Sequence, residues 1–169
     1  MTSSSKHRSS FAACAVAVVA AVAAQPAAAD NPYAQFYGST SSTQTSRWCQ
    51  TPWVGGVKGA YGAWGYYIDG CTASVQCPWS RCRTMSASGE LRAPAGVTTT
   101  CNMAVRVFTS SGYLRWRIDR SSSGTDGYCY ASAGSAETTY GEWVTVQTNG
   151  VIAYDNTASV KSFVWLAPA

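Results

Sequence analysis

The stretch CNMAVRVFTSSGYLRWRID, residues 101–119, decides the fold, because apolar and polar residues alternate on both sides of a short polar turn at residues 109–112. Apolar residues fill every second position: Cys101, Met103, Val105 and Val107 before the turn, and Leu114, Trp116 and Ile118 after it. The other face carries Arg106, Arg115 and Arg117. A period of two is typical of a strand with one buried face. The stretch therefore predicts a β-hairpin with an apolar face and an arginine-bearing face.

Other stretches of the chain also predict strands. Residues 71–77 alternate between apolar and polar side chains, and residues 159–166 are largely apolar. Residues 143–147 and 151–154 flank the sequence TNG at 148–150, and an Asn-Gly pair favours a tight hairpin turn. We find no sustained helical periodicity. We therefore predict an all-β fold, an antiparallel β-sandwich, with a small barrel as the alternative.

The first 29 residues have the three parts of a secretory signal peptide. Residues 6–8 are basic, residues 11–24 form an uncharged apolar run, and residues 27–29 are small alanines at the expected cleavage site. The apolar run is shorter than the ~20 residues that a membrane-spanning helix requires. We expect a mature chain that begins at Asp30 and is secreted, extracellular and not attached to a membrane.

Cysteine content indicates a disulfide framework in the mature chain. The full sequence has seven cysteines, of which Cys14 lies in the signal peptide. The remaining six are Cys49, Cys71, Cys77, Cys82, Cys101 and Cys129. An even number of cysteines in a short exported chain predicts three disulfides.

Spacing alone does not select among the fifteen pairings that six cysteines allow. If residues 71–77 are extended, their ends lie ~20 Å apart, which is beyond the ~7 Å between Cα atoms that a disulfide tolerates. The turn-like sequence between Cys77 and Cys82 favours a local bridge. Two pairs would then remain, Cys49–Cys71 and Cys101–Cys129.

The mature chain is expected to lack histidine, because the single histidine, His7, lies in the signal peptide. Histidine is the commonest general base and the commonest metal ligand, so its absence argues against many catalytic and zinc sites. Asp119 and Asp126 flank the polar segment 120–125, expected to be a loop, and a converging carboxylate pair would suit glycoside cleavage. Orienting turn backbone is the favoured role for both. We predict no enzyme activity, no cofactor and no metal.

The charge of the mature chain argues against a nucleic-acid partner. From Asp30 onward the chain has ten basic and eight acidic residues. This small net positive charge is far from the strong basic excess of nucleic-acid binders. Eight of the ten basic residues are arginines, and aromatic residues are abundant. Arginine, tyrosine and tryptophan are enriched at protein interfaces. We therefore predict an extracellular protein partner that contacts Arg106, Arg115 and Arg117.

Residues 30–46 differ in composition from the rest of the chain. Tyr33, Phe36 and Tyr37 form an aromatic cluster, and residues 39–46 are all serine, threonine or glutamine. Such a polar tract buries too little surface to offset the entropy of ordering it. We predict a flexible arm at 30–46, which binds a partner by adding a strand to its sheet edge, and a disulfide-rich β-domain at 47–169. An edge strand of the domain is the alternative.

Carbohydrate binding is the alternative function. Exposed tryptophan and tyrosine rings offer flat surfaces for sugar stacking, and the candidates are Trp53, Trp64, Tyr66 and Trp79. Packing against glycine-rich loops is the structural explanation for the same residues. Inhibition of an enzyme is a further alternative function for a small secreted binding protein.

The overall layout resembles the small adaptor subunits of the umbrella toxin particles secreted by filamentous actinobacteria. The shared features are a signal at 1–29, a polar arm at 31–46 and a cysteine-stapled β-domain without catalytic residues. The resemblance covers the whole chain and rests on no sequence motif, so it assigns no site residue. It implies an adaptor that joins a lectin-like subunit to a larger toxin chain.

Overall fold

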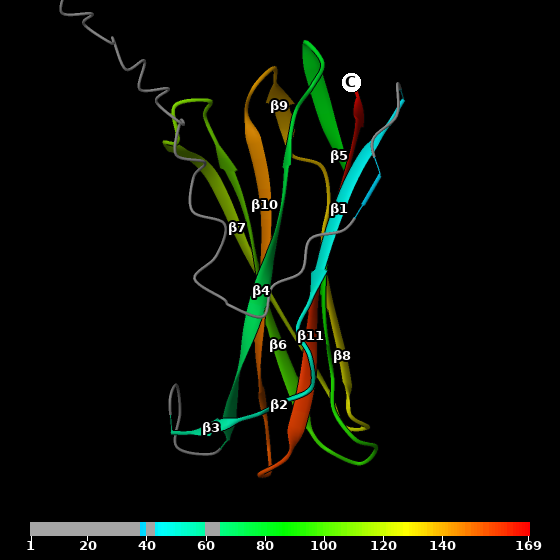
Figure 1. The fold of residues 1–169 in the computed structure, drawn as a ribbon, viewed down its shortest axis with the longest axis vertical. Helices are drawn as coiled ribbons and strands as arrows, with labels where there is room; N and C mark the ends of the chain where they lie inside the picture. Colours follow the sequence, from blue (N-terminus) through cyan, green and yellow to red (C-terminus); the bar gives the residue numbers. More distant parts are fainter. Residues whose placement is uncertain (1–37, 40–42, 60–64) are drawn as a thin grey trace, which may run out of the picture.

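The computed structural model describes residues 38–39, 43–59 and 65–169, which form β-strands and no helix (Figure 1). One antiparallel sheet has the order β1-β11-β5-β8, with β2 paired to β11 and β9 paired to β5. Its strands are β1 (Thr45–Gln50), β2 (Val54–Gly55), β5 (Arg81–Arg92), β8 (Tyr128–Ala133), β9 (Glu137–Thr139) and β11 (Thr157–Pro168). The all-β prediction is therefore confirmed for the described residues.

The other antiparallel sheet has the order β3-β4-β10-β6-β7. Its strands are β3 (Val57–Lys58), β4 (Tyr66–Gln76), β6 (Thr99–Phe108), β7 (Leu114–Gly124) and β10 (Trp143–Ile152). Each sheet contributes one face to a shared core, so the fold is sandwich-like. Fully buried side chains come from both sheets, among them Ile68, Leu91, Met103, Val144 and Leu166. Burial at every second residue of β10 shows the alternation directly.

The predicted hairpin at 101–119 is confirmed, with one correction to its faces. Strands β6 and β7 pair along their length, and Arg106 lies opposite Arg117. A bulge breaks the register after Val107, so that Phe108 pairs with Leu114. One extra residue moves the preceding side chain to the other face of a strand. Leu114 was predicted on the apolar inner face and is instead 53% exposed.

The second predicted hairpin is wrong, because residues 148–150 are not a turn. They lie inside β10, which pairs with β4 on one side and β6 on the other. Gly150 has no positive φ. A methyl group added there would overlap Leu91 and lie 2.7 Å from the carbonyl oxygen of Thr100. The glycine thus serves a close approach between the sheets and not a turn.

The two sheets are in direct contact around Thr148. Ser162 of β11 donates a hydrogen bond to the carbonyl oxygen of Cys71 at 2.8 Å and lies 2.9 Å from the hydroxyl of Thr148. A methyl group at Gly89 of β5 would overlap the Thr148 side chain. Because buried hydroxyls need partners, this contact holds the two sheets at one separation.

Strand β1 begins at Thr45, two residues before the expected start of the domain. It forms an edge of its sheet by pairing with β11, and Thr45 is buried. The amide of Ser46 donates to the carbonyl oxygen of Ser39 at 2.8 Å. The last part of the predicted arm is thus an edge strand. Residues 30–37 and 40–42 lie outside the described residues.

Two disulfides connect the sheets. Cys49 of β1 is bonded to Cys71 of β4 with 6.1 Å between Cα atoms, and Cys77 is bonded to Cys82 with 5.9 Å. Both pairs match the predicted pairing. Cys101 of β6 and Cys129 of β8 are buried and not bonded. A hydrogen bond between the two thiols raises the pKa of Cys101, which places the sulfurs side by side.

Candidate functional site

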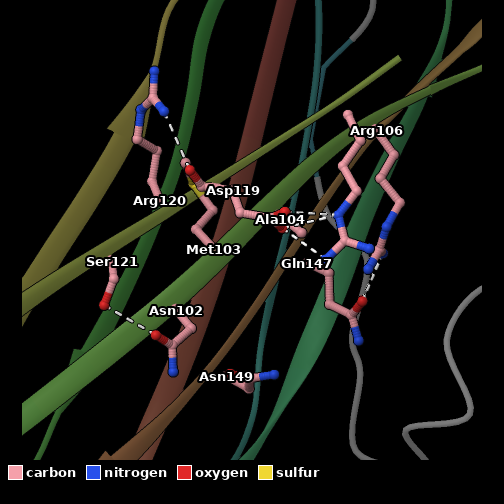
Figure 2. Close-up of a pocket in the computed structure, with 10 residues that line it drawn as sticks. Asn102, Met103, Ala104, Arg106, Asp119, Arg120, Ser121, Gln147 and Asn149 are labelled. Atoms are coloured by element: carbon pink, nitrogen blue, oxygen red, sulfur yellow. Dashed lines mark hydrogen bonds and ion pairs between the residues drawn. The ribbon is translucent and has the colours of Figure 1, made fainter. Parts of the chain in front are cut away.

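A polar groove of about 290 Å³ lies on the outer face of β6, β7 and β10 (Figure 2). Its lining is rich in arginine and in side-chain amides: Asn102, Met103, Ala104, Arg106, Arg117, Asp119, Arg120, Ser121, Gln147 and Asn149. Arg106 and Arg117 are two of the three arginines predicted to contact a partner. The groove is therefore the candidate functional site.

Strand register explains how residues distant in sequence meet in the groove. Ala104 of β6 lies between Gln147 of β10 and Asp119 of β7. The next row places Asn102 between Asn149 and Ser121. Because alanine has a small side chain, the middle of this surface is hollow, and the longer neighbours form its walls.

Arg106 is the least exposed of the three arginines that line the groove. It is half-buried, and its Nη1 donates a 2.7 Å hydrogen bond to Oε1 of Gln147 (Figure 2). Burial lowers the pKa of Arg106, and the positive charge of Arg117 lowers it further. Like charges directly opposite each other on paired strands are destabilising. The two arginines thus repel each other, and the carboxylate of Asp119 offsets part of that repulsion.

Arg117 is oriented by Asp119 on the same strand. Its Nε donates to both carboxylate oxygens at 2.9 Å, and its Nη2 donates to Oδ1 at 2.8 Å. The hydrogen bond to Asp119 raises the pKa of Arg117, and the same bond lowers the pKa of Asp119. Both side chains are about half exposed. The pair fixes the direction of the guanidinium and leaves it open to a ligand.

Arg115, the third predicted arginine, is not in the groove. Its Nε lies 2.7 Å from Oε1 of Glu142, and its Nη2 donates to Oε2 of Glu142 at 2.9 Å. The same Nη2 donates to the carbonyl oxygen of Glu137 at 2.8 Å. Burial raises the pKa of Glu142, but hydrogen bonds from Thr139 and Arg115 outweigh it, so the pKa is below its usual value. Arg115 therefore connects β7 to the start of β10 and to β9 of the other sheet.

Sequence reasoning missed much of the groove. Residues 120–124 were expected to be a loop, yet they continue β7 and pair with β6. Ser121 donates a 3.0 Å hydrogen bond to Asn102, and Arg120 donates to the carbonyl oxygen of Asp119 at 3.2 Å. Exposed polar strands on a sheet face resemble loops in composition. The segment RSSSG at 120–124 has no apolar alternation, so only its pairing with β6 distinguishes it from a loop.

Asp119 and Asp126 do not form a carboxylate pair. Asp119 binds Arg117 in the groove, whereas Oδ1 of Asp126 accepts a hydrogen bond from the amide of Gly96 at 3.0 Å. Asp126 thus has the turn-orienting role that was favoured. Within the described ranges, no three His, Cys, Asp or Glu side chains gather to hold a metal ion. No helix in those ranges is long and apolar enough to cross a membrane.

The predicted aromatic residues have different environments. Trp53 is 54% exposed, whereas Tyr66 and Trp79 are partly buried against the core. Trp64 lies outside the described residues, as do Tyr33, Phe36 and Tyr37 of the arm. Packing therefore accounts for Tyr66 and Trp79, and Trp53 keeps an accessible ring.

No protein-family model matches the chain, and no curated protein matches it.

The groove has three arginines and one aspartate among its lining residues, so positive charge dominates. Guanidinium groups bind carboxylates through two parallel hydrogen bonds. The amides of Asn102, Gln147 and Asn149 can both donate and accept, which suits peptide groups. The groove is thus suited to an extended segment with acidic side chains.

Proposed function

We propose that this protein is a secreted, non-catalytic binding protein that docks on another extracellular protein through the polar groove. The partner presents an acidic segment, whose carboxylates lie between Arg106 and Arg117. The observation that carries this proposal is the cross-strand pair of arginines, one of which is half-buried. A bound carboxylate adds a second negative charge beside Asp119 and offsets the remaining repulsion between the two arginines.

The size of the groove supports an anchor point within a wider interface. About 290 Å³ is slightly less than the ~300–1,000 Å³ of typical small-molecule pockets. An apolar row lies next to the arginine row on the same face, where Phe108 is flanked by Trp143 and Leu114. Arginines beside aromatic residues are typical of interface hot spots. The two rows together offer a charged and an apolar contact to one partner.

The test is affinity capture from native culture fluid with the mature chain and a doubly substituted variant, Arg106→Gln with Arg117→Gln. We expect the variant to capture at least tenfold less of the partner than the wild type, and the wild type to release the partner as the salt concentration rises. Arg81→Gln is the matched control, because Arg81 forms an exposed ion pair with Glu137 on the other sheet. Equal capture by all three proteins would refute the groove as the docking site.

We propose that residues 30–44 supply a second contact, by adding a strand to the sheet edge of the partner. The layout shared with umbrella toxin adaptors makes a large toxin chain the proposed partner. Deletion of 30–44 keeps all of β1, which begins at Thr45, so the domain should still fold. We expect the deletion to weaken capture. Capture at full strength with a normal melting curve would contradict the role of the arm.

We also propose that Cys101 and Cys129 form a third disulfide in the secreted protein. The pair lies between β6 and β8, so it would join the two sheets as the other two disulfides do. Extracellular oxidants would take two electrons and two protons from the adjacent thiols. The even cysteine count and the burial of both thiols support this assignment.

A further inference from the structure

We infer that the protein has a second binding site, for a neutral sugar ring, at the end of the molecule where β5 leads to β6 and β7 leads to β8 (Figure 1). An open basin of about 520 Å³ lies there. Its lining residues are Trp53, Arg92, Ala93, Ala95, Asp126, Gly127 and Tyr128. This site is separate from the polar groove and does not depend on the function proposed for it.

Two accessible aromatic rings give the basin its apolar surface. Trp53 is 54% exposed and Tyr128 is 44% exposed. Large exposed aromatic rings are informative when they line a concave surface together. The C–H face of a pyranose ring is flat and apolar, so it can cover an indole without leaving polar groups unpaired. The rings therefore supply the stacking half of sugar recognition.

Polar groups in the same basin supply hydrogen-bonding partners of both kinds. The guanidinium of Arg92 lies 5.6 Å from the centre of the Tyr128 ring, and its side chain is 60% exposed. Its Nε lies 3.5 Å from Glu90, so other N–H groups point to solvent. Asp126 binds Gly96 through Oδ1, and no described residue hydrogen-bonds to its Oδ2. A donor and an acceptor thus flank the rings, as sugar hydroxyls require.

The floor of the basin is held in one conformation by backbone hydrogen bonds. The amide of Gly127 donates to Val97 and its carbonyl accepts from Ala93, both at 2.7 Å. Gly127 has φ +72°, and a side chain there would overlap the carbonyl oxygens of Ala93 and Pro94. A preformed site loses little entropy when a ligand binds. The glycine is thus required by the shape of the site.

Charge at the basin favours a neutral sugar over an anionic ligand. Among the described residues that line the basin, Arg92 is the single cation, and the carboxylates of Asp126 and nearby Glu90 offset its charge. An anion in the basin would meet the carboxylate of Asp126 as well as the guanidinium of Arg92. The neutral hydroxyls of a hexopyranose can accept from Arg92 and donate to Asp126, so they match both groups.

The experiment is binding of the mature chain to an array of neutral oligosaccharides built from glucose, galactose, mannose and N-acetylglucosamine, followed by calorimetry with the strongest binder. We expect Trp53→Ala to weaken binding at least tenfold and Trp53→Phe to weaken it less. Asp126→Asn should also weaken binding while its side-chain oxygen still accepts from Gly96. Tyr140→Ala is the matched control, because Tyr140 is 73% exposed and absent from the basin lining.

Absence of binding to every neutral oligosaccharide would overturn the inference. Binding that Trp53→Ala and Asp126→Asn leave unchanged would overturn it as well, since the sugar would lie elsewhere. The double variant at Arg106 and Arg117 separates the two proposals, because it should lose protein capture and keep sugar binding. Thermal melting of each variant verifies that the fold is intact.

Discussion

Substitution of Glu142 by glutamine tests how the end of the sandwich is held. Glu142 is buried immediately before β10, and its carboxylate accepts from Arg115 at 2.7 and 2.9 Å and from the amide of Thr139 at 2.8 Å. Glutamine has the same shape but no charge, and its amide nitrogen must point at one of these donors. The variant thus removes the negative charge and one hydrogen-bond acceptor while it keeps the shape of the side chain.

The magnitude follows from these hydrogen bonds. Bonds to a charged partner contribute about 1.5–3 kcal/mol each, against about 0.5–1.5 kcal/mol for neutral ones. The guanidinium of Arg115 is 44% exposed, so solvent screens its share. We therefore expect Glu142→Gln to reduce the free energy of unfolding by about 1–3 kcal/mol. Each kcal/mol corresponds to a melting temperature lower by roughly 3–5 °C for a domain of this size.

The assay is thermal unfolding followed by circular dichroism at several pH values, with Glu137→Gln as the control. Glu137 forms its ion pair with Arg81 while 64% exposed, so that substitution should cost less than about 1 kcal/mol. The pKa of Glu142 in the fold is lower than its ordinary 4.5. A lowered carboxyl pKa stabilises the fold fully above the unfolded value, and this stabilisation is lost as pH falls through the folded value.

The difference in stability between wild type and Glu142→Gln should therefore be constant above about pH 5 and should shrink below pH 4.5. Equal losses in the Glu142 and Glu137 variants would refute the reasoning, because burial would then make no difference. A difference that persists unchanged at pH 3 would refute it too, since protonation of this glutamate in the unfolded state should by then have reduced the difference.

Two further predictions concern the contacts between the sheets. Secreted protein that is unfolded in the presence of an alkylating reagent should show no free thiol, and labelling of two thiols would contradict the third disulfide. Replacing Cys101 and Cys129 together by serine should lower the free energy of unfolding by about 3–4 kcal/mol, because the bonded pair restricts the entropy of the unfolded chain. Gly89→Ala should lower the free energy of unfolding in urea by about 1–3 kcal/mol or more, because its methyl group overlaps Thr148. Gly134→Ala is the control: its methyl group meets open space, so the change should stay within about 0.5 kcal/mol. Equal effects would show that the sheets move apart easily at this contact.

Local signals in the sequence predicted those parts of the fold that depend on neighbouring residues. The alternation at 101–119 gave the β6–β7 hairpin, and the turn-like spacing gave the Cys77–Cys82 disulfide. Gly150 was misjudged because its partners, Leu91 and Thr100, are distant in sequence. A glycine that permits a close approach and a glycine that permits a turn have the same local appearance.

The candidate groove was predictable only in part for the same reason. Periodicity placed Arg106 and Arg117 on one face, and pairing of β6 with β7 set them opposite each other. Gln147 and Asn149 enter the groove because β10 pairs with β6, which no local pattern revealed. Arg115 was assigned to the same face because the bulge after Val107 leaves no trace in the alternation.

Substitution of Arg106 tests whether the charged residues of this sheet face bind a partner or prevent unwanted strand pairing. Charges on an edge strand prevent unwanted strand pairing, which would explain Arg117 and Arg120 on β7 without any partner. Arg106 lies on β6, which is paired on both sides, so edge protection does not apply to it. Arg106→Met should therefore leave the free energy of unfolding within about 1 kcal/mol of the wild type, or raise it, and should abolish partner capture. A large loss of stability with capture intact would show that Arg106 serves the fold, and the groove would then have no ligand to explain.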